Sequence, residues 1–261
     1  IASLWRRASR PARTALLATL LLAGTGVLTL SAQRFGRRRG QEPVDATKLP
    51  YDGRFTFARI RFPLTSDARW DVKWAHDYPR AERHFMEILR AMTSMRPTMG
   101  GGTVLDLDDP DLFKFPVAYV SEPGFWAPSE ADVTALRAYL QKGGFLIIDD
   151  FEGPHWYNFA AVMQRVLPNA RILPLDVSDP IFDSFFRIES LEYYHPYSRM
   201  PSQFLGIYED DDPSKRLMVI INYNNDIGDY MEFSDEGFFP VDMSNTAYKL
   251  AVNYVVYAMT H

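Results

Sequence analysis

The sequence predicts an α/β fold, a mostly parallel sheet flanked by helices, preceded by an N-terminal transmembrane helix. Strand-like apolar segments alternate with helical ones along residues 54–261, and this alternation is typical of a largely parallel sheet. Phe145–Ile148 is continuously apolar, as a strand buried on both faces of such a sheet is. The apolar run Thr14–Ala32 would form roughly 28 Å of helix, about the thickness of the hydrocarbon core of a bilayer.

Basic residues flank this apolar run, and no acidic residue occurs in the first 41 positions. Residues 1–13 form a basic segment, and residues 14–32 have the composition of an export signal, with Leu30-Ser31-Ala32 as a plausible cleavage site. Because the run is part of this chain, we expect a retained signal-anchor. The flanking arginines are Arg6, Arg7, Arg10 and Arg13 before the run and Arg34, Arg37, Arg38 and Arg39 after it.

The orientation of this anchor follows from the order of its parts, because four arginines on each side leave the positive-inside rule balanced. Arginines, an apolar run and small residues in that order favour a cytoplasmic N-terminus. We therefore expect a single-pass inner-membrane protein with a periplasmic domain. Arg34, Arg37, Arg38 and Arg39 are expected to contact anionic lipid headgroups or an acidic partner surface; a purely topological role is the alternative.

The domain is expected to begin after a linker. Residues 33–53 are rich in Arg, Gly and Pro and show no periodicity, which is typical of a linker. Phe55, Phe57, Ile60 and Phe62 predict a first strand, a loop follows over 63–79, and a helix is expected from Pro79 to Met95.

The remaining elements follow the same alternation. Short apolar runs predict strands at Thr103–Leu107, Phe115–Val120, Phe145–Ile148, Arg171–Leu175, Leu205–Tyr208 and Leu217–Tyr223. The last two, separated by an acidic turn, suit an antiparallel pair. Ser129 and Asp132 have the spacing of a capping box and predict a helix that ends at Gly143. Further helices are expected at Trp156–Leu167 and Asn245–Met259.

Composition excludes several classes of function. Residues 42–261 hold 20 basic and 33 acidic residues, a net charge of −13, so the domain is a poor nucleic-acid binder. The chain has no cysteine, which excludes disulfides, thiolate metal sites and a cysteine nucleophile. No Gly-x-Ser-x-Gly elbow or phosphate-binding loop occurs. We therefore assign no catalytic residue and no cofactor.

Two acidic segments are candidate ligand sites. Asp149 and Asp150 end the central strand, and His155 follows; ligands of parallel sheets gather beyond such strand ends. These groups suit a divalent ion or acid–base chemistry, but we favour a structural interpretation, in which one Asp caps the next helix and the other binds loop amides. The segment Tyr223–Asp229 is typical of a turn; if it meets Asp149 in space, Asp226 would add a ligand for a metal or sugar.

Three segments resemble a bacterial family of unknown function over roughly residues 54–261. They are Gly143–Phe151, Asp179–Phe182 with Phe185-Phe186, and Tyr223–Asp229. Members of this family look like relatives of class I glutamine amidotransferases, so the resemblance implies a flavodoxin-like, amidotransferase-like sheet. It does not imply amidotransferase activity, because that reaction needs a cysteine nucleophile.

A membrane-tethered domain of this kind is also similar to the extrinsic subunit that braces the reaction centre inside the double antenna ring of certain phototrophic bacteria. The resemblance implies reaction-centre and antenna polypeptides, together with the lipid bilayer, as partners. We therefore expect a non-catalytic, membrane-anchored scaffold subunit. The alternatives are an extracytoplasmic metal-dependent hydrolase or carbohydrate-binding domain that uses Asp149, Asp150, His155 and Asp226, and a periplasmic sensor.

Overall fold

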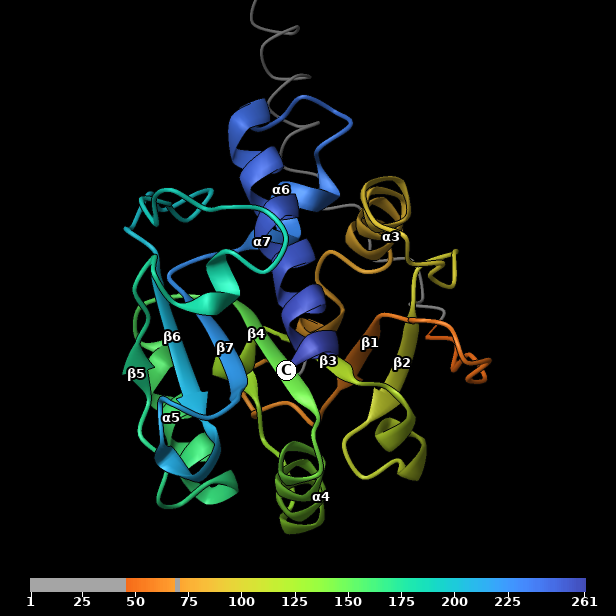
Figure 1. Cartoon of the computed structure of the whole chain (residues 1–261). Helices are drawn as coiled ribbons and strands as arrows, with labels where there is room; N and C mark the ends of the chain where they lie inside the picture. The colour runs from red at the N-terminus through yellow and green to blue at the C-terminus, as the bar shows by residue number, and fades with distance from the viewer. Residues whose placement is uncertain (1–45, 69–70) are drawn as a thin grey trace, which may run out of the picture. The chain divides into compact units, whose positions relative to one another are not determined.

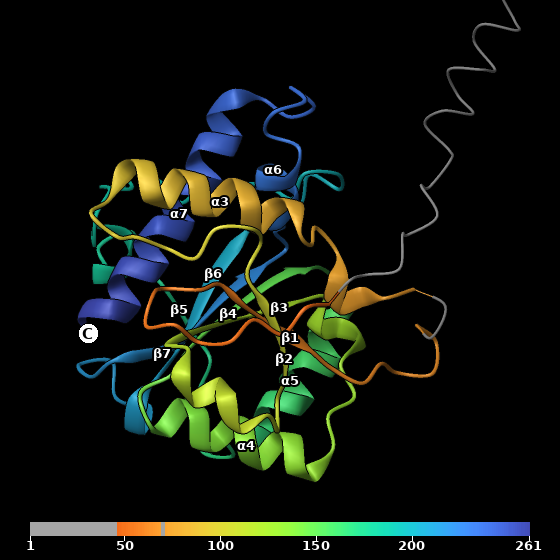
Figure 2. The same cartoon turned by 90° about the vertical axis from the view of Figure 1, so that its right-hand side faces the viewer.

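A seven-stranded sheet with helices on both faces forms the domain (Figures 1 and 2). The computed structural model describes residues 46–68 and 71–261. The strand order is β2-β1-β3-β4-β7-β6-β5. The strands are β1 (Ala58–Arg61), β2 (Thr103–Asp106), β3 (Val117–Ser121), β4 (Phe145–Phe151), β5 (Leu173–Pro174), β6 (Gln203–Tyr208) and β7 (Leu217–Tyr223).

The sheet is mixed, with its parallel part in the first five positions. Strands β2, β1, β3, β4 and β7 pair in parallel, whereas β6 pairs antiparallel with both β7 and β5. The predicted α/β class and the predicted antiparallel pairing of β6 with β7 are therefore confirmed. Strand β4 lies in the middle of the sheet and is almost entirely buried, as its apolar sequence requires.

Helices cover the two faces of the sheet in separate groups. Helices α3 (Arg80–Met92), α6 (Ile227–Glu232) and α7 (Val241–Thr260) lie together on one face, and α4 (Glu130–Gln141) and α5 (His155–Val166) lie on the other (Figure 2). The capping box predicted for α4 is present: Ser129 accepts from the backbone N–H of Asp132, whose carboxylate accepts from that of Ser129.

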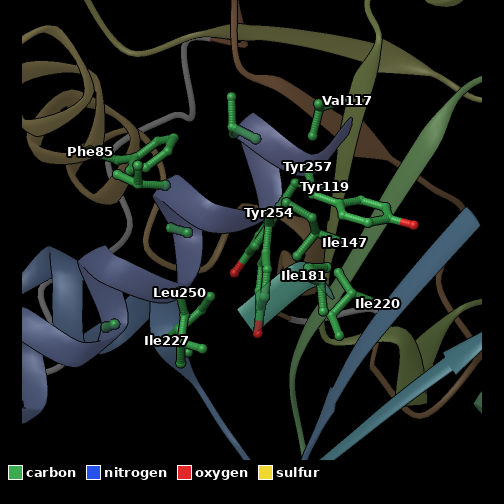
Figure 3. Packing of buried hydrophobic residues seen from close by; sticks show 14 of the residues in the cluster. Phe85, Val117, Tyr119, Ile147, Ile181, Ile220, Ile227, Leu250, Tyr254 and Tyr257 are labelled. Atoms are coloured by element: carbon green, nitrogen blue, oxygen red, sulfur yellow. The ribbon is translucent and has the colours of Figure 1, made fainter. Parts of the chain in front are cut away.

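The main hydrophobic core lies between the sheet and α3, α6 and α7. Tyr254 and Tyr257 of α7 lie on the side of the helix that faces Ile147 and Tyr119 of the sheet, and Leu250 lies beside Ile227 (Figure 3). Polar atoms of these buried rings have partners, since the Tyr257 hydroxyl accepts from the backbone N–H of Leu217 at 3.0 Å. Burial of apolar surface contributes about 25 cal/mol per Å², so this contact stabilises the domain.

Two elements differ from the sequence-based expectation. Strand β5 has only two residues, because Pro174 has no N–H to donate and lies at the edge of the sheet. The segment Tyr223–Asp229 was expected to be a turn, but its last three residues form the first turn of helix α6. Asp226 caps this helix, because the Asp226 carboxylate accepts from the backbone N–H of Asp229 at 2.8 Å. A six-residue helix is too short for its apolar periodicity to be recognised.

Several expectations for the N-terminal region fall outside the described residues: the basic segment 1–13, the signal-anchor 14–32, linker residues 33–45, and Arg34, Arg37, Arg38 and Arg39. Within residues 46–68 and 71–261, no helix has both the length and the apolar character needed to cross a bilayer. Linker residues 46–53 contain no helix or strand. Leu49, in this part of the linker, contacts β2: its backbone N–H donates to the Thr103 hydroxyl at 2.9 Å.

Candidate functional site

The carboxyl ends of three neighbouring parallel strands meet where the strand order reverses. From β1 the chain goes to β2 on one side and to β3 and β4 on the other, and ligands of open α/β sheets bind at such a reversal. Ser121 ends β3 and pairs in register with Asp149 near the end of β4, and β7 follows as the next strand. The loop after β1 carries His76 and Asp77, so this edge of the sheet is the candidate site.

Five aspartates gather here: Asp77, Asp149, Asp150, Asp226 and Asp229, which we call the acidic centre. Asp77, Asp150 and Asp226 each offer a carboxylate oxygen, and the three oxygens lie within 4.8 Å of one another. A second set of that size consists of Asp77, Asp229 and Glu232. The acidic centre therefore joins the loop before α3, the end of β4 and the start of α6.

Asp149 is the most buried member and is held on one side by hydrogen bonds. Its Oδ2 accepts from the Tyr119 hydroxyl at 2.8 Å and from the Gly228 N–H at 3.0 Å. The segment that follows β7 therefore meets Asp149, as a metal or sugar site shared by the two acidic segments requires. The other oxygen, Oδ1, is buried without a hydrogen-bond partner among the described residues.

Four residues around the centre have left-handed backbones although none is glycine. The φ angles are 65° at Asp77, 51° at Glu122, 58° at Asp150 and 52° at Asn224. Asp and Asn tolerate this region better than most residues, and single occurrences of it commonly collect at functional sites. At Asp150 this conformation follows the break in the β4–β7 register between Ile148 and Phe151.

Positive charge at the site comes from buried side chains that already have carboxylate partners. Arg59 of β1 is fully buried and pairs with Glu82 of α3 at 2.5 Å. Its guanidinium also donates to the carbonyls of Trp74 and His76 at 3.0 and 2.9 Å and lies 4.7 Å from the centroid of the Tyr119 ring. Arg59 thereby fixes the loop that carries Asp77.

His76 is the imidazole next to Asp150. Its Nδ1 lies 2.9 Å from Glu122 and 3.7 Å from Asp150, and its Nε2 lies 3.3 Å from Asp71. Burial disfavours the charged ring, but the hydrogen bonds with Asp150 and Glu122 outweigh it and raise the pKa of His76 to about 10. His76 is therefore a cation at neutral pH.

Burial and mutual repulsion shift the acidic centre toward its neutral forms. Burial, with the charges of Asp229 and Asp150, raises the pKa of Asp77 well above its usual range. Burial, followed by the same like charges and that of Asp77, also raises the pKa of Asp226. Burial raises the pKa of Asp150 to about 7, against the hydrogen bond with His76. Such a cluster is stable only with bound protons or a bound cation.

The structure brings most of the sequence-predicted candidates together. Asp149, Asp150 and Asp226 all belong to the acidic centre. Neither Asp149 nor Asp150 caps α5, because that helix begins after Pro154 without a side-chain cap. Asp149 binds a backbone amide, but that amide, the Gly228 N–H, belongs to the first turn of α6 and not to a loop. His155 belongs to none of the described groups of possible metal ligands, and its ring packs on Phe125 at 4.6 Å between centroids.

Sequence reasoning missed Asp77, His76 and Arg59. The first two lie in a segment, residues 63–79, that shows only loop composition. Arg59 lies inside a strand between apolar residues. An arginine at such a position is the one local signal of a buried ion pair, because a buried charge must have a partner. Their shared position follows from the packing of this loop over the β1–β3 ends.

The arrangement suits ion binding better than catalysis on a large substrate. Carboxylate oxygens are ligands that hard cations such as Mg²⁺ and Ca²⁺ prefer. Asp77, Asp149, Asp226 and Asp229 are buried, and only Asp150 and His76 are partly exposed. A small ion or a proton fits such a closed site, whereas a polymer has no route to four of the five carboxylates.

Comparison with known proteins gives a family without an assigned activity. No curated protein matches the chain. The model of a family described as a domain of unknown function (DUF4159) matches residues 56–259, a range that includes every strand and the whole acidic centre. The resemblance to a family of unknown function is thereby confirmed. The chain belongs to the DUF4159 family.

Proposed function

We propose that this protein is a non-catalytic, membrane-anchored extrinsic subunit that scaffolds a larger membrane complex. The observation that carries the proposal is a contrast in exposure. The carboxylates that would perform chemistry are closed off, with Asp149 fully buried, whereas Tyr197 and Phe238 are 57% and 52% exposed. An acidic interior with exposed rings above it favours binding of another protein over turnover of a substrate.

The exposed rings belong to one aromatic group. Tyr197 and Phe238 both contact Phe239, with ring centroids 5.9 and 4.8 Å apart, and Phe239 in turn contacts Tyr230 of α6 at 4.8 Å. We call Tyr197 and Phe238, which pack on the buried Phe239, the aromatic surface. Aromatic side chains are enriched in the buried centres of protein interfaces.

The N-terminal sequence supports a membrane location for the partner. The apolar run 14–32 with arginines on both sides would hold the domain at the bilayer, and the arginines at 34–39 would contact anionic lipid or an acidic protein surface. The partner proposed for the aromatic surface is therefore an integral membrane subunit. On the periplasmic side of the inner membrane, the domain would lie against subunits that extend from the bilayer.

The strand order supports a flavodoxin-like assignment. Strands β2-β1-β3-β4 have the order found in flavodoxin-like sheets, and we extend this to an amidotransferase-like fold on the resemblance described above. The same resemblance extends the scaffold proposal to a photosynthetic reaction-centre–light-harvesting complex. Reaction-centre and antenna polypeptides would then be the partners.

Affinity purification from native membranes tests the proposal. A tagged full-length chain is solubilised with its membrane in mild detergent, and mass spectrometry identifies the mature N-terminus and the co-purifying chains. We expect an intact apolar run and stoichiometric membrane subunits, pigment-binding ones included. A mature chain that starts at Gln33 and leaves the membrane fraction, or a wild-type chain without membrane partners, contradicts the proposal.

A pair of variants tests the aromatic surface. Phe238→Ser removes an exposed ring from this surface, and Tyr157→Ser removes a ring that is 77% exposed on α5, on the opposite face of the sheet. We expect Phe238→Ser to lose the co-purifying subunits and Tyr157→Ser to keep them. Equal recovery of partners with both variants would place the interface elsewhere.

One observation favours a second function, a metal-dependent hydrolase or carbohydrate-binding domain. His76, Glu122 and Asp150 offer ligand atoms within 4.8 Å of one another, and His76 is 27% exposed, so this group faces the surface. A metal ion bound there would displace the proton from the ligating nitrogen of His76. Cation-dependent turnover of an ester, phosphoester or glycan that disappears in Glu122→Gln would support the hydrolase. Glycan binding without turnover, lost in the same variant, would support the carbohydrate-binding domain.

A further inference from the structure

We propose that Asp77, Asp150 and Asp226 bind one hard divalent cation, Ca²⁺ or Mg²⁺, at the carboxyl edge of the sheet. The inference is independent of the scaffold function and of any partner. It rests on the geometry of the three carboxylates, on a buried oxygen without a partner, and on the balance of charge around them.

The geometry matches a coordination shell. The three carboxylate oxygens lie within 4.8 Å of one another, and two opposite ligands of a Ca²⁺ ion are about 4.8 Å apart when each bond is about 2.4 Å. Ser121 donates to Oδ2 of Asp150 at 2.9 Å, and the Asp229 N–H donates to Oδ1 of Asp226. Each of these two carboxylates therefore keeps its second oxygen for a cation.

An unpartnered buried oxygen points independently to a ligand. Asp77 is 8% exposed, and its Oδ2 has no hydrogen-bond partner in the described part of the chain. A buried carboxylate oxygen without a partner is costly, since its hydration is lost without replacement. Asp77 contributes a carboxylate oxygen to both all-carboxylate groups at this site, and its Oδ2 lies toward the first turn of α6, 2.3 Å from the position of a Cβ built on Gly228.

Within residues 46–68 and 71–261, no ion pair involves Asp77 or Asp226, and Asp150 has only the more distant His76. Arg59 pairs with Glu82, and Lys73 lies 2.9 Å from Asp71 and 3.0 Å from Glu122. His76 is shared between Glu122 and Asp71, with Asp150 farther away at 3.7 Å. A divalent ion would therefore supply the positive charge that these three carboxylates need when they are ionised.

The same charges select this position over the neighbouring one. In the group His76, Glu122 and Asp150, Glu122 already lies 2.9 Å from the His76 imidazole and 3.0 Å from the Lys73 ammonium. A metal ion there would have to compete with both side chains for the same carboxylate. A cation between Asp77, Asp150 and Asp226 would connect the loop before α3, the end of β4 and the cap of α6.

Cation titration of the full-length protein in detergent, after removal of metal with chelator, tests this proposal. We expect isothermal titration calorimetry to detect one Ca²⁺ or Mg²⁺ per chain. The melting temperature should rise by roughly 5–10 °C at a free cation concentration about 100 times Kd. Tb³⁺, used as a Ca²⁺ probe, should show tyrosine-sensitised emission, because Tyr119 lies at the site, and Ca²⁺ should displace it.

Isosteric variants locate the site. Asp77→Asn and Asp226→Asn remove one charge each, and Asn at 226 can still cap α6. We expect each to weaken cation binding by at least the roughly 10- to 100-fold that loss of an outer-shell partner costs at other metal sites. Asp132→Asn is the matched control, since Asp132 is also 8% exposed but lies on α4, across the sheet.

The outcomes separate cleanly. Binding by wild type and Asp132→Asn, together with weakened binding by Asp77→Asn and Asp226→Asn, supports the site. Wild-type protein that binds neither Ca²⁺ nor Mg²⁺ overturns it, and so does wild-type affinity in either Asp77→Asn or Asp226→Asn. If the two variants do not fold, the wild-type calorimetry and the Ca²⁺-displaceable Tb³⁺ emission still decide.

Discussion

Replacement of Arg59 tests how the loop that carries Asp77 is held. Arg59→Met keeps most of the side-chain volume but removes the charge that faces Glu82. Both members of this pair are 1% exposed, so Glu82 would be left as a buried, unpaired carboxylate. Breaking a buried pair in this way costs about 3–5 kcal/mol. The carbonyls of Trp74 and His76 lose a donor as well.

The reverse replacement should cost less. Glu82→Gln leaves Arg59 with its two carbonyl acceptors and with the Tyr119 ring at 4.7 Å. We expect a loss of about 1–3 kcal/mol, the cost of one unmade buried hydrogen bond. The double variant Arg59→Met/Glu82→Leu removes both charges and should recover much of the stability lost in Arg59→Met.

Urea denaturation at pH 7, followed by far-UV circular dichroism and tryptophan fluorescence, measures these differences. The expected order of destabilisation is Arg59→Met above Glu82→Gln, with the double variant below Arg59→Met. The reasoning is refuted if Arg59→Met costs less than about 1 kcal/mol, or if Glu82→Gln costs as much as Arg59→Met.

Three further predictions concern other parts of the domain. Burial lowers the pKa of His195, and its Nδ1 accepts two backbone N–H groups. The unfolded chain therefore binds the proton more tightly, so the stability from neutral His195 is complete above about pH 6.5 and is lost as pH falls below it. Urea titrations between about pH 7.5 and 5 should give a shallower loss in His195→Gln than in wild type; equal slopes would contradict this. Ser129→Ala removes the α4 cap and should cost about 1 kcal/mol in urea unfolding, whereas the exposed mid-helix Thr134→Ala should cost nothing. Gly228→Ala places a Cβ 2.3 Å from Oδ2 of Asp77 and should cost about 1–3 kcal/mol through overpacking; unchanged thermal stability and cation affinity would show that Asp77 is not held at that position.

Local sequence determined the elements whose formation depends on neighbouring residues. Phe145–Ile148 could only become a strand buried on both faces, and Ser129 with Asp132 could only cap the helix between them and Gly143. The α/β class followed from the alternation of these elements. The resemblance to a family of unknown function could also be recognised from the sequence, because the segments that carry it are short and continuous along the chain.

The candidate site was partly accessible for the same reason. Asp149 and Asp150 follow a strand that the sequence identifies, and the rule that ligands gather beyond strand ends applies to any parallel sheet. That Asp226 meets them depended on β7 lying beside β4, a pairing between residues about 70 positions apart. No periodicity encodes such a partner.

By itself the sequence determined most of the strands and helices, with β5 and α6 as exceptions, because apolar spacing and caps act over a few positions. Only the tertiary structure decided that Asp77 joins Asp150 and Asp226 and that His76 rather than His155 accompanies them. The physical reason is that the loop after β1 is placed by Arg59, whose buried charge finds Glu82 on α3 and two loop carbonyls. Such contacts depend on the whole sheet being assembled, and residues 63–79 contain no local signal of them.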